Sequence, residues 1–125
     1  MKLSKKICLT VLVLLAALVF FACDNPSNSK PDISEGLDGT KWECKFSEGG
    51  FNLIEILEFS TNTVNDILMA DIPGYGKEKI SEDTYNYSYS PATRTGTINE
   101  IIPITITDNE ILKATGSTRE FTLVY

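Results

Sequence analysis

The chain has 125 residues, about one domain's worth, with 11 basic residues, 17 acidic residues and no histidine. The acidic balance argues against a nucleic-acid partner, because such binding depends on Lys and Arg placed against phosphate. The missing histidine removes the commonest general base and the commonest transition-metal ligand, so we expect no enzyme, no cofactor and no metal site.

The first 22 residues predict a secretory signal peptide. Lys2, Lys5 and Lys6 form a basic head, and the 16 residues from Ile7 to Ala22 are almost unbroken apolar sequence. As a helix this run would rise about 24 Å, short of the ~30 Å hydrocarbon core of a bilayer. Removing the signal with its three lysines leaves eight basic against 17 acidic residues, a net charge of −9 for the mature chain.

Ala22 and Cys23, directly after the apolar run, resemble the cleavage site of a bacterial lipoprotein precursor. The usual box in that family is Leu-Ala-Gly/Ala-Cys; here it reads Phe20-Phe21-Ala22-Cys23, so the last two positions match. The resemblance implies that Cys23 receives a diacylglycerol, that the signal is cut before it, and that the protein is lipid-anchored in the cell envelope, on the extracytoplasmic side of the inner or outer membrane. Two alternatives are a soluble secreted protein and an uncleaved helical anchor.

The segment after this cysteine predicts a flexible tether. Residues 24–36 are rich in Pro, Ser, Asn and Asp, with Ile33 as the one apolar residue, and such a segment buries too little surface to offset its ordering entropy. The domain organisation is therefore a signal peptide at 1–22, the lipidated Cys23 and a disordered tether at 23–36, and a folded domain at 37–125. In that domain, Cys44 alternates with Trp42 and Phe46 and is interpreted as a small buried hydrophobe.

From Leu37 onward the chain reads as strands separated by turns, without a convincing helix. Glu55 interrupts the alternation of the second strand, which predicts either a β-bulge or a strand covered on both faces. Residues 77–80 form at best a short, charged strand. The eight plausible strands cover Thr40–Phe46, Phe51–Phe59, Thr63–Asp71, Thr84–Ser90, Thr95–Asn99, Ile102–Thr107, Glu110–Thr115 and Thr118–Tyr125.

An even number of strands with short turns predicts an all-β fold, a small antiparallel up-and-down barrel rather than a sandwich. Closure requires the last strand, Thr118–Tyr125, to pair antiparallel with the first, Thr40–Phe46, because an open edge invites aggregation.

Three segments carry a resemblance to the lipocalin-like (calycin) domains of bacterial lipoproteins: 37–42 with its Gly39-Thr40-Lys41-Trp42, 87–98, and 118–125. Lipocalins open with Gly-x-Trp, one residue shorter than here, and an Arg near their last strand packs on that Trp at the closed end. The candidate here, Arg119, starts the last strand and is expected at the end away from Trp42. The resemblance implies a fold and leaves the ligand open.

Tyr85, Tyr87 and Tyr89 share one face of a strand and are the most suggestive functional feature. They are either plain cross-strand packing or, with Trp42, the lining of a ligand site. Of the chemical motifs, Gly74-Tyr75-Gly76-Lys77 lacks the first glycine of a phosphate loop.

We therefore expect a membrane-anchored, non-catalytic module that binds a small apolar or amphipathic ligand. The alternative is an inhibitor or adhesin-like protein that binds a partner protein or envelope component through its outer strands and loops.

Overall fold

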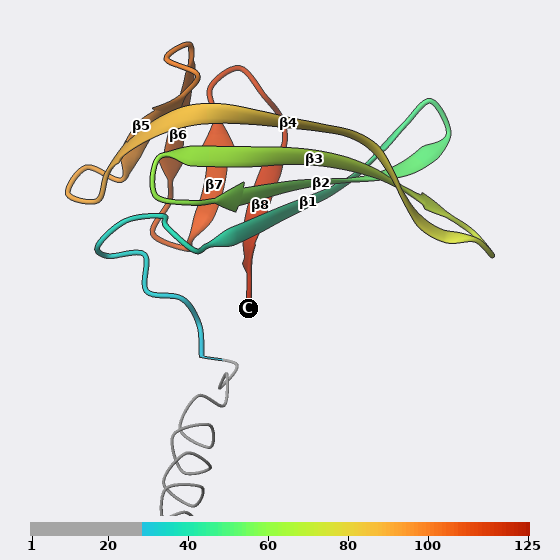
Figure 1. The fold of residues 1–125 in the computed structure, drawn as a ribbon, viewed down its shortest axis with the longest axis horizontal. Coiled ribbons are helices and arrows are strands. Elements are labelled where there is room, and N and C mark those ends of the chain that lie inside the picture. Colours follow the sequence, from blue (N-terminus) through green and yellow to red (C-terminus); the bar gives the residue numbers. More distant parts are fainter. Residues whose placement is uncertain (1–28) are drawn as a thin grey trace, which may run out of the picture.

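The computed structural model describes residues 29–125, and within this range the chain forms β-strands and no helix. The predicted signal peptide and Cys23 lie outside the described residues. Each strand pairs antiparallel with its sequence neighbour, and β1 also pairs with β8, so the sheet is a closed eight-stranded barrel (Figure 1). The strands are β1 Lys41–Glu48, β2 Phe51–Phe59, β3 Thr63–Ile72, β4 Gly76–Ser90, β5 Thr95–Ile98, β6 Ile102–Ile106, β7 Ile111–Ala114 and β8 Glu120–Val124.

The predicted all-β, up-and-down barrel is confirmed, and its architecture is consistent with a lipocalin-like fold. The predicted closure is confirmed as well. Trp42 of β1 lies opposite Leu123 of β8, and Lys41 lies opposite Val124. The C-terminal strand therefore completes the barrel, and the chain ends beside the start of β1.

The strands of the first half are longer than those of the second. In Figure 1, β3 and β4 extend beyond the short strands β5–β8 as an arm that reaches its tip at the turn before Gly76. The β1–β2 hairpin extends in the same direction, because β2 pairs with β3 as far as Asp71. β4 pairs with β5 only from Tyr87 to Ser90, so the preceding part of β4 has a neighbour on one side only. Charged residues along residues 77–83 protect this open edge from adventitious strand pairing.

The arm corrects one expectation. Residues 77–80 are not a separate short strand, because β4 runs without interruption for 15 residues and includes Thr84–Ser90. The register between β3 and β4 shifts between Leu68 and Met69, where Ile80 is the extra residue on β4. A bulge there lets one strand curve from the arm into the barrel wall.

The second strand resolves the alternative that Glu55 raised. β2 pairs with β1 and with β3 in unbroken register, so it contains no bulge. Ile54 and Ile56, 3% and 8% exposed, are buried on one side, and Leu57 and Phe59 are buried on the other. The strand is therefore covered on both faces.

The packed domain begins earlier than the sequence indicates. Ile33, in the predicted tether, is 8% exposed and belongs to the core cluster with Leu37 and Trp42. Lys30 forms an ion pair with Glu110 of the β6–β7 turn. Ile33 and Lys30, in the C-terminal part of the predicted tether, therefore contact the barrel, because the isoleucine meets apolar partners at the barrel's end that the local composition does not reveal.

Candidate functional site

One end of the barrel is closed by tight packing around Trp42. Its side chain is fully buried, and its indole Nε1 donates a hydrogen bond to Thr40 Oγ1 over 3.0 Å. Thr40 Oγ1 in turn donates to the carbonyl oxygen of Leu37 over 2.6 Å. Leu37 and Ile33 are themselves buried in the same cluster. The N-terminal segment thus seals this end, and every side-chain polar group in the seal has a partner.

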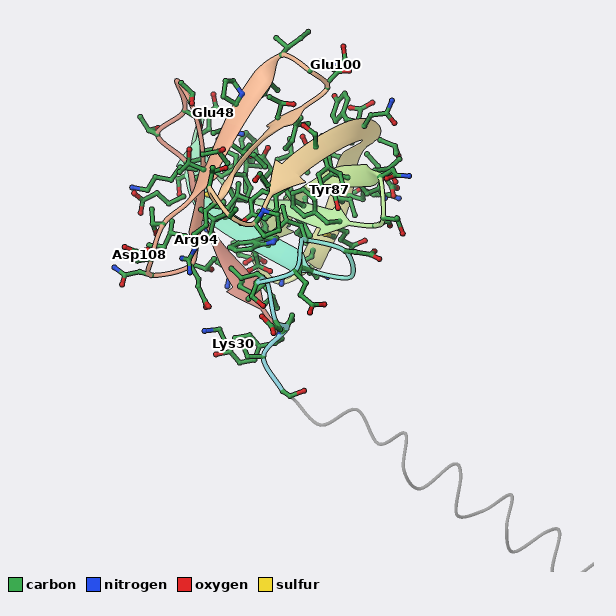
Figure 2. The ribbon with its side chains drawn as sticks, turned by 90° about the vertical axis from the view of Figure 1, so that its left-hand side faces the viewer. Lys30, Glu48, Tyr87, Arg94, Glu100 and Asp108 are labelled. Carbon is green, nitrogen blue, oxygen red and sulfur yellow. The ribbon has the colours of Figure 1, made fainter. Side chains whose placement is uncertain are left out.

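The other half of the interior holds a cavity of about 370 Å³. Ile102, at the start of β6, and residues 115–117, in the β7–β8 turn, lie on its rim. In Figure 2, Glu48 lies at the upper end of the barrel and Lys30 at the lower end. Glu48 is an ion-pair partner of Arg119, which lines the cavity, so this side of the cavity is remote from Lys30. The wall is largely apolar and is built by Leu57, Val64, Ile98, Ile104, Leu112 and Phe121.

Charged side chains gather on one side of this cavity. Glu55 of β2, Asp66 of β3 and Arg119, which precedes β8, all line it. One guanidinium nitrogen of Arg119 lies 2.5 Å from Glu55 Oε2, and the other lies 3.6 Å from Glu48 Oε2. The guanidinium also stacks on the Phe46 ring, with its carbon 3.9 Å from the ring centroid. Arg119 is therefore fixed by three contacts within the protein.

Asp66 is the least compensated of these groups. It forms no ion pair with any described residue, and burial raises its pKa to about 6 from an ordinary value of 3.8. The negative charges of Glu55 and Asp83 and a hydrogen bond with Glu55 raise the pKa further, whereas Arg119 lowers it. The cavity thus holds a carboxyl group that changes charge in mildly acidic conditions.

The structure separates the four residues proposed as ligand contacts. Tyr85 lines the cavity. Trp42 lies in the sealed end and is not among the residues that line it. Tyr87 and Tyr89 line a different hollow of about 410 Å³, between Leu37 and the β2–β3 turn. The tyrosine stripe therefore spans two environments, and Tyr85 is its member at the cavity.

Tyr87 has a clear packing role. Its ring meets the Phe59 ring edge to face at a centroid distance of 4.8 Å, and its hydroxyl donates to the carbonyl oxygen of Ser60 over 2.7 Å. Burial raises the pKa values of Tyr87 and Tyr89. Both rings pack against the core cluster. Cross-strand packing, one of the two interpretations of the stripe, thus describes Tyr87 well.

Sequence reasoning missed the charged group at the cavity, although it identified parts of the signal. Glu55 interrupts an alternating apolar series of the second strand, and Asp66 shares the parity of Val64. Arg119 was expected at the end away from Trp42, which its contacts with Phe46 and Glu48 confirm. A charged residue on the inward face of a small barrel needs a polar partner, and this requirement is the signal that would have predicted Glu55, Asp66 and Arg119 as one group.

The sequence predicts a buried Cys44 and a lipidated Cys23, and the structure describes only the first. Cys44 is buried and unpaired, as predicted for a small core residue, and burial raises its thiol pKa. The predicted lipidation site Cys23 lies outside the described residues.

Among residues 29–125, no group of three or more His, Cys, Asp and Glu side chains is placed to hold a metal ion. Within the same range, no helix has the length and apolar character needed to cross a bilayer.

Comparison with known proteins leaves these features without a template. No protein-family model matches the chain, and no curated protein or solved structure matches it significantly. The cavity's geometry and chemistry are therefore the basis for a function.

Proposed function

We propose that this protein is a lipid-anchored cell-envelope protein whose lipocalin-like barrel binds a small apolar or amphipathic ligand without catalysis. The observation that carries the binding role is the cavity of about 370 Å³ between Leu57, Leu112 and Phe121. Ligand pockets commonly measure about 300–1,000 Å³ and are lined mainly by apolar side chains with a few polar groups. The cavity is at the small end of this range, which favours a small ligand.

The two ends of the barrel support this role in different ways. The sealed end around Trp42 gives the cavity a rigid floor, because its polar groups are satisfied and its side chains are fully buried. The interior beyond it is hollow. A completely filled interior would have favoured an interaction protein that uses its outside.

A non-catalytic role fits the charged group. Glu55 is neutralised by Arg119 over 2.5 Å, so it is held as an ion pair. Asp66 is close enough for the charge of Glu55 to raise its pKa. The chain also has no histidine to act as a base.

The binding role is tested with the neutral fluorescent probe N-phenyl-1-naphthylamine. We expect saturable binding to the wild-type domain and a loss of at least tenfold in affinity for Ala114→Phe, which places a ring in the cavity from β7. Thr105→Phe adds the same ring on the exposed side of β6 and is the matched control. Thermal melting shows whether each variant folds, and Ile102→Trp, at the exposed rim, is a second way to fill the cavity if Ala114→Phe unfolds.

Two results would count against the binding role. Wild-type protein that binds no probe would refute it directly. Probe binding that Ala114→Phe and Ile102→Trp leave unchanged in folded protein would place the probe elsewhere on the molecule.

The anchoring role is supported by the basic head, the 16-residue apolar run and Ala22-Cys23. Cys23→Ala, expressed from the full chain in a bacterium, should move the protein from the detergent phase to the aqueous phase or block its processing. Unchanged detergent partitioning with a normally cut N-terminus would contradict lipidation at Cys23.

The alternative, an interaction protein, is favoured by one observation. Residues 76–84 of β4 are all exposed, and this part of the strand extends past the ladder with β5. Such an arm offers alternating charge to a partner protein. Failure of the probe experiment would make this alternative the leading one.

A further inference from the structure

The charges at the cavity indicate which kind of head group the ligand carries. Arg119 is the positive group that lines it, and this side chain is already occupied by Glu55, Glu48 and the Phe46 ring. An anionic ligand would have to displace Glu55 from Arg119. It would also leave that carboxylate partly buried and unpaired, since the Glu55 side chain is only 15% exposed.

The negative charge at the same place is in excess. Asp66 has no cationic partner among the described residues, and neither has Asp83, which lies opposite it on β4. Glu55 and Glu48 are the ion-pair partners of the one guanidinium at this place, and the charges of Glu55 and Asp83 both act unfavourably on an ionised Asp66. A positive group near Asp66 therefore relieves repulsion, a neutral group leaves it unchanged, and a negative group adds to it.

We infer that the cavity binds an amphipathic amine, with its ammonium group against Asp66 and Glu55 and its apolar body against Leu57, Ile104 and Leu112. This inference deepens the proposed function and rests on it. Taking about 30 Å³ for each water-sized group, 370 Å³ holds roughly twelve such groups. A straight chain of about ten carbons with one head group is near that size.

The Asp66 carboxyl makes the preference depend on pH. Above its pKa of about 6 the group is ionised and attracts an ammonium ion; below that value it is protonated and the attraction is lost. The other groups that act on it are Glu55 from β2, Asp83 from β4 and Arg119 before β8, with Glu48 of β1 reached through Arg119. An alkylamine keeps its charge over this range because its pKa resembles that of lysine, about 10.

The experiment compares three ligands with the same tail: decylamine, 1-decanol and decanoate, below their micelle concentrations. Each competes with N-phenyl-1-naphthylamine for the mature domain at pH 7.5 and at pH 5. At pH 7.5 we expect the amine to bind about tenfold more tightly than the alcohol, and the carboxylate to bind most weakly. At pH 5 the advantage of the amine over the alcohol should shrink.

Variants assign the effect to the residue. Asp66→Asn should reduce amine affinity about tenfold at pH 7.5 and leave alcohol affinity unchanged. Asp71→Asn removes the same charge from an exposed site at the far end of β3, outside the cavity, and should change neither. Thermal melting of both variants confirms that they fold.

The outcomes separate the inference from the proposed function. Equal affinity for all three ligands would refute the amine preference while leaving the binding role intact. Tightest binding of decanoate would overturn the inference and identify Arg119 as an anion site. Failure of the naphthylamine probe itself to bind would refute the binding role, and the inference with it.

Discussion

Gly96 in β5 lies very close to the backbone of β4, and substituting it tests this close approach of the two strands. A Cβ atom at this position would lie 2.1 Å from the carbonyl oxygen of Ser88, 3.0 Å from Tyr89 Cα and 3.1 Å from the Ser88 carbonyl carbon. All three atoms are backbone, so no side chain can rotate away. Since non-bonded heavy atoms are best placed about 3.5 Å apart, the closest contact falls short by about 1.4 Å.

Gly96→Ala therefore requires β4 and β5 to separate at a point where Gly96 pairs with Tyr89. Overpacking a core typically costs about 1–3 kcal/mol and sometimes more. Because the clash is with backbone, we expect at least about 3 kcal/mol. For a domain of this size a loss of that order lowers the melting temperature by about 12 °C or more.

The control is Gly116→Ala in the β7–β8 turn. Its Cβ would meet nothing within 4 Å, but its φ of +83° lies in the left-handed region, where a side chain costs about 1–2 kcal/mol. Urea unfolding followed by circular dichroism measures both variants. If Gly96→Ala unfolds at the wild-type urea concentration, or loses less stability than Gly116→Ala, the close approach of β4 and β5 is wrong.

Two further predictions concern the two ends of the barrel. Thr40→Val leaves the buried indole Nε1 of Trp42 without its acceptor and should lower the free energy of unfolding in urea by about 1–3 kcal/mol. The control Thr122→Val removes an exposed hydroxyl contact on β8 and should lower it by under about 1 kcal/mol. Equal losses would contradict the role of the seal. Because the pKa of Asp66 is raised from 3.8 to about 6 on folding, the folded state binds more protons between these values, so the free energy of unfolding should fall as pH rises through that window and then level off. Asp66→Asn should reduce that fall, and an unchanged pH profile in this variant would show that another group titrates.

Much of the fold follows from period-two alternation. Trp42 and Cys44 are alternate residues of β1, and both are buried in the core. Phe121 of β8 is buried in the same core. Closure also followed, since an unpaired last strand would leave an open edge. The error at residues 77–80 has a physical cause: charged residues on an exposed, one-sided strand carry no alternation of burial, although the backbone pairing with β3 continues.

The seal could not be predicted from local composition. Ile33 is surrounded by polar residues, and its burial depends on a contact with a core formed by residues distant in the sequence. The charged group had a similar origin. Glu55 and Asp66 lie on neighbouring strands, where the register between β2 and β3 places Leu57 opposite Asp66. Arg119 is distant in the sequence, and only the closure of the barrel brings it to the same wall.

The inward face of the first three strands changes character along the barrel axis. Near the seal it presents Trp42, Phe59 and Val64, all buried. Toward the rim the same faces present Glu48, Glu55 and Asp66. A ligand with one polar end therefore gains most by entering with its apolar end first, because its head then stays beside the carboxylates and does not meet a dry floor. Burial of the Asp66 carboxylate near the rim lowers the stability of the fold. The same carboxylate makes one end of the cavity polar and leaves the other end apolar, so a ligand with one polar end has a preferred orientation.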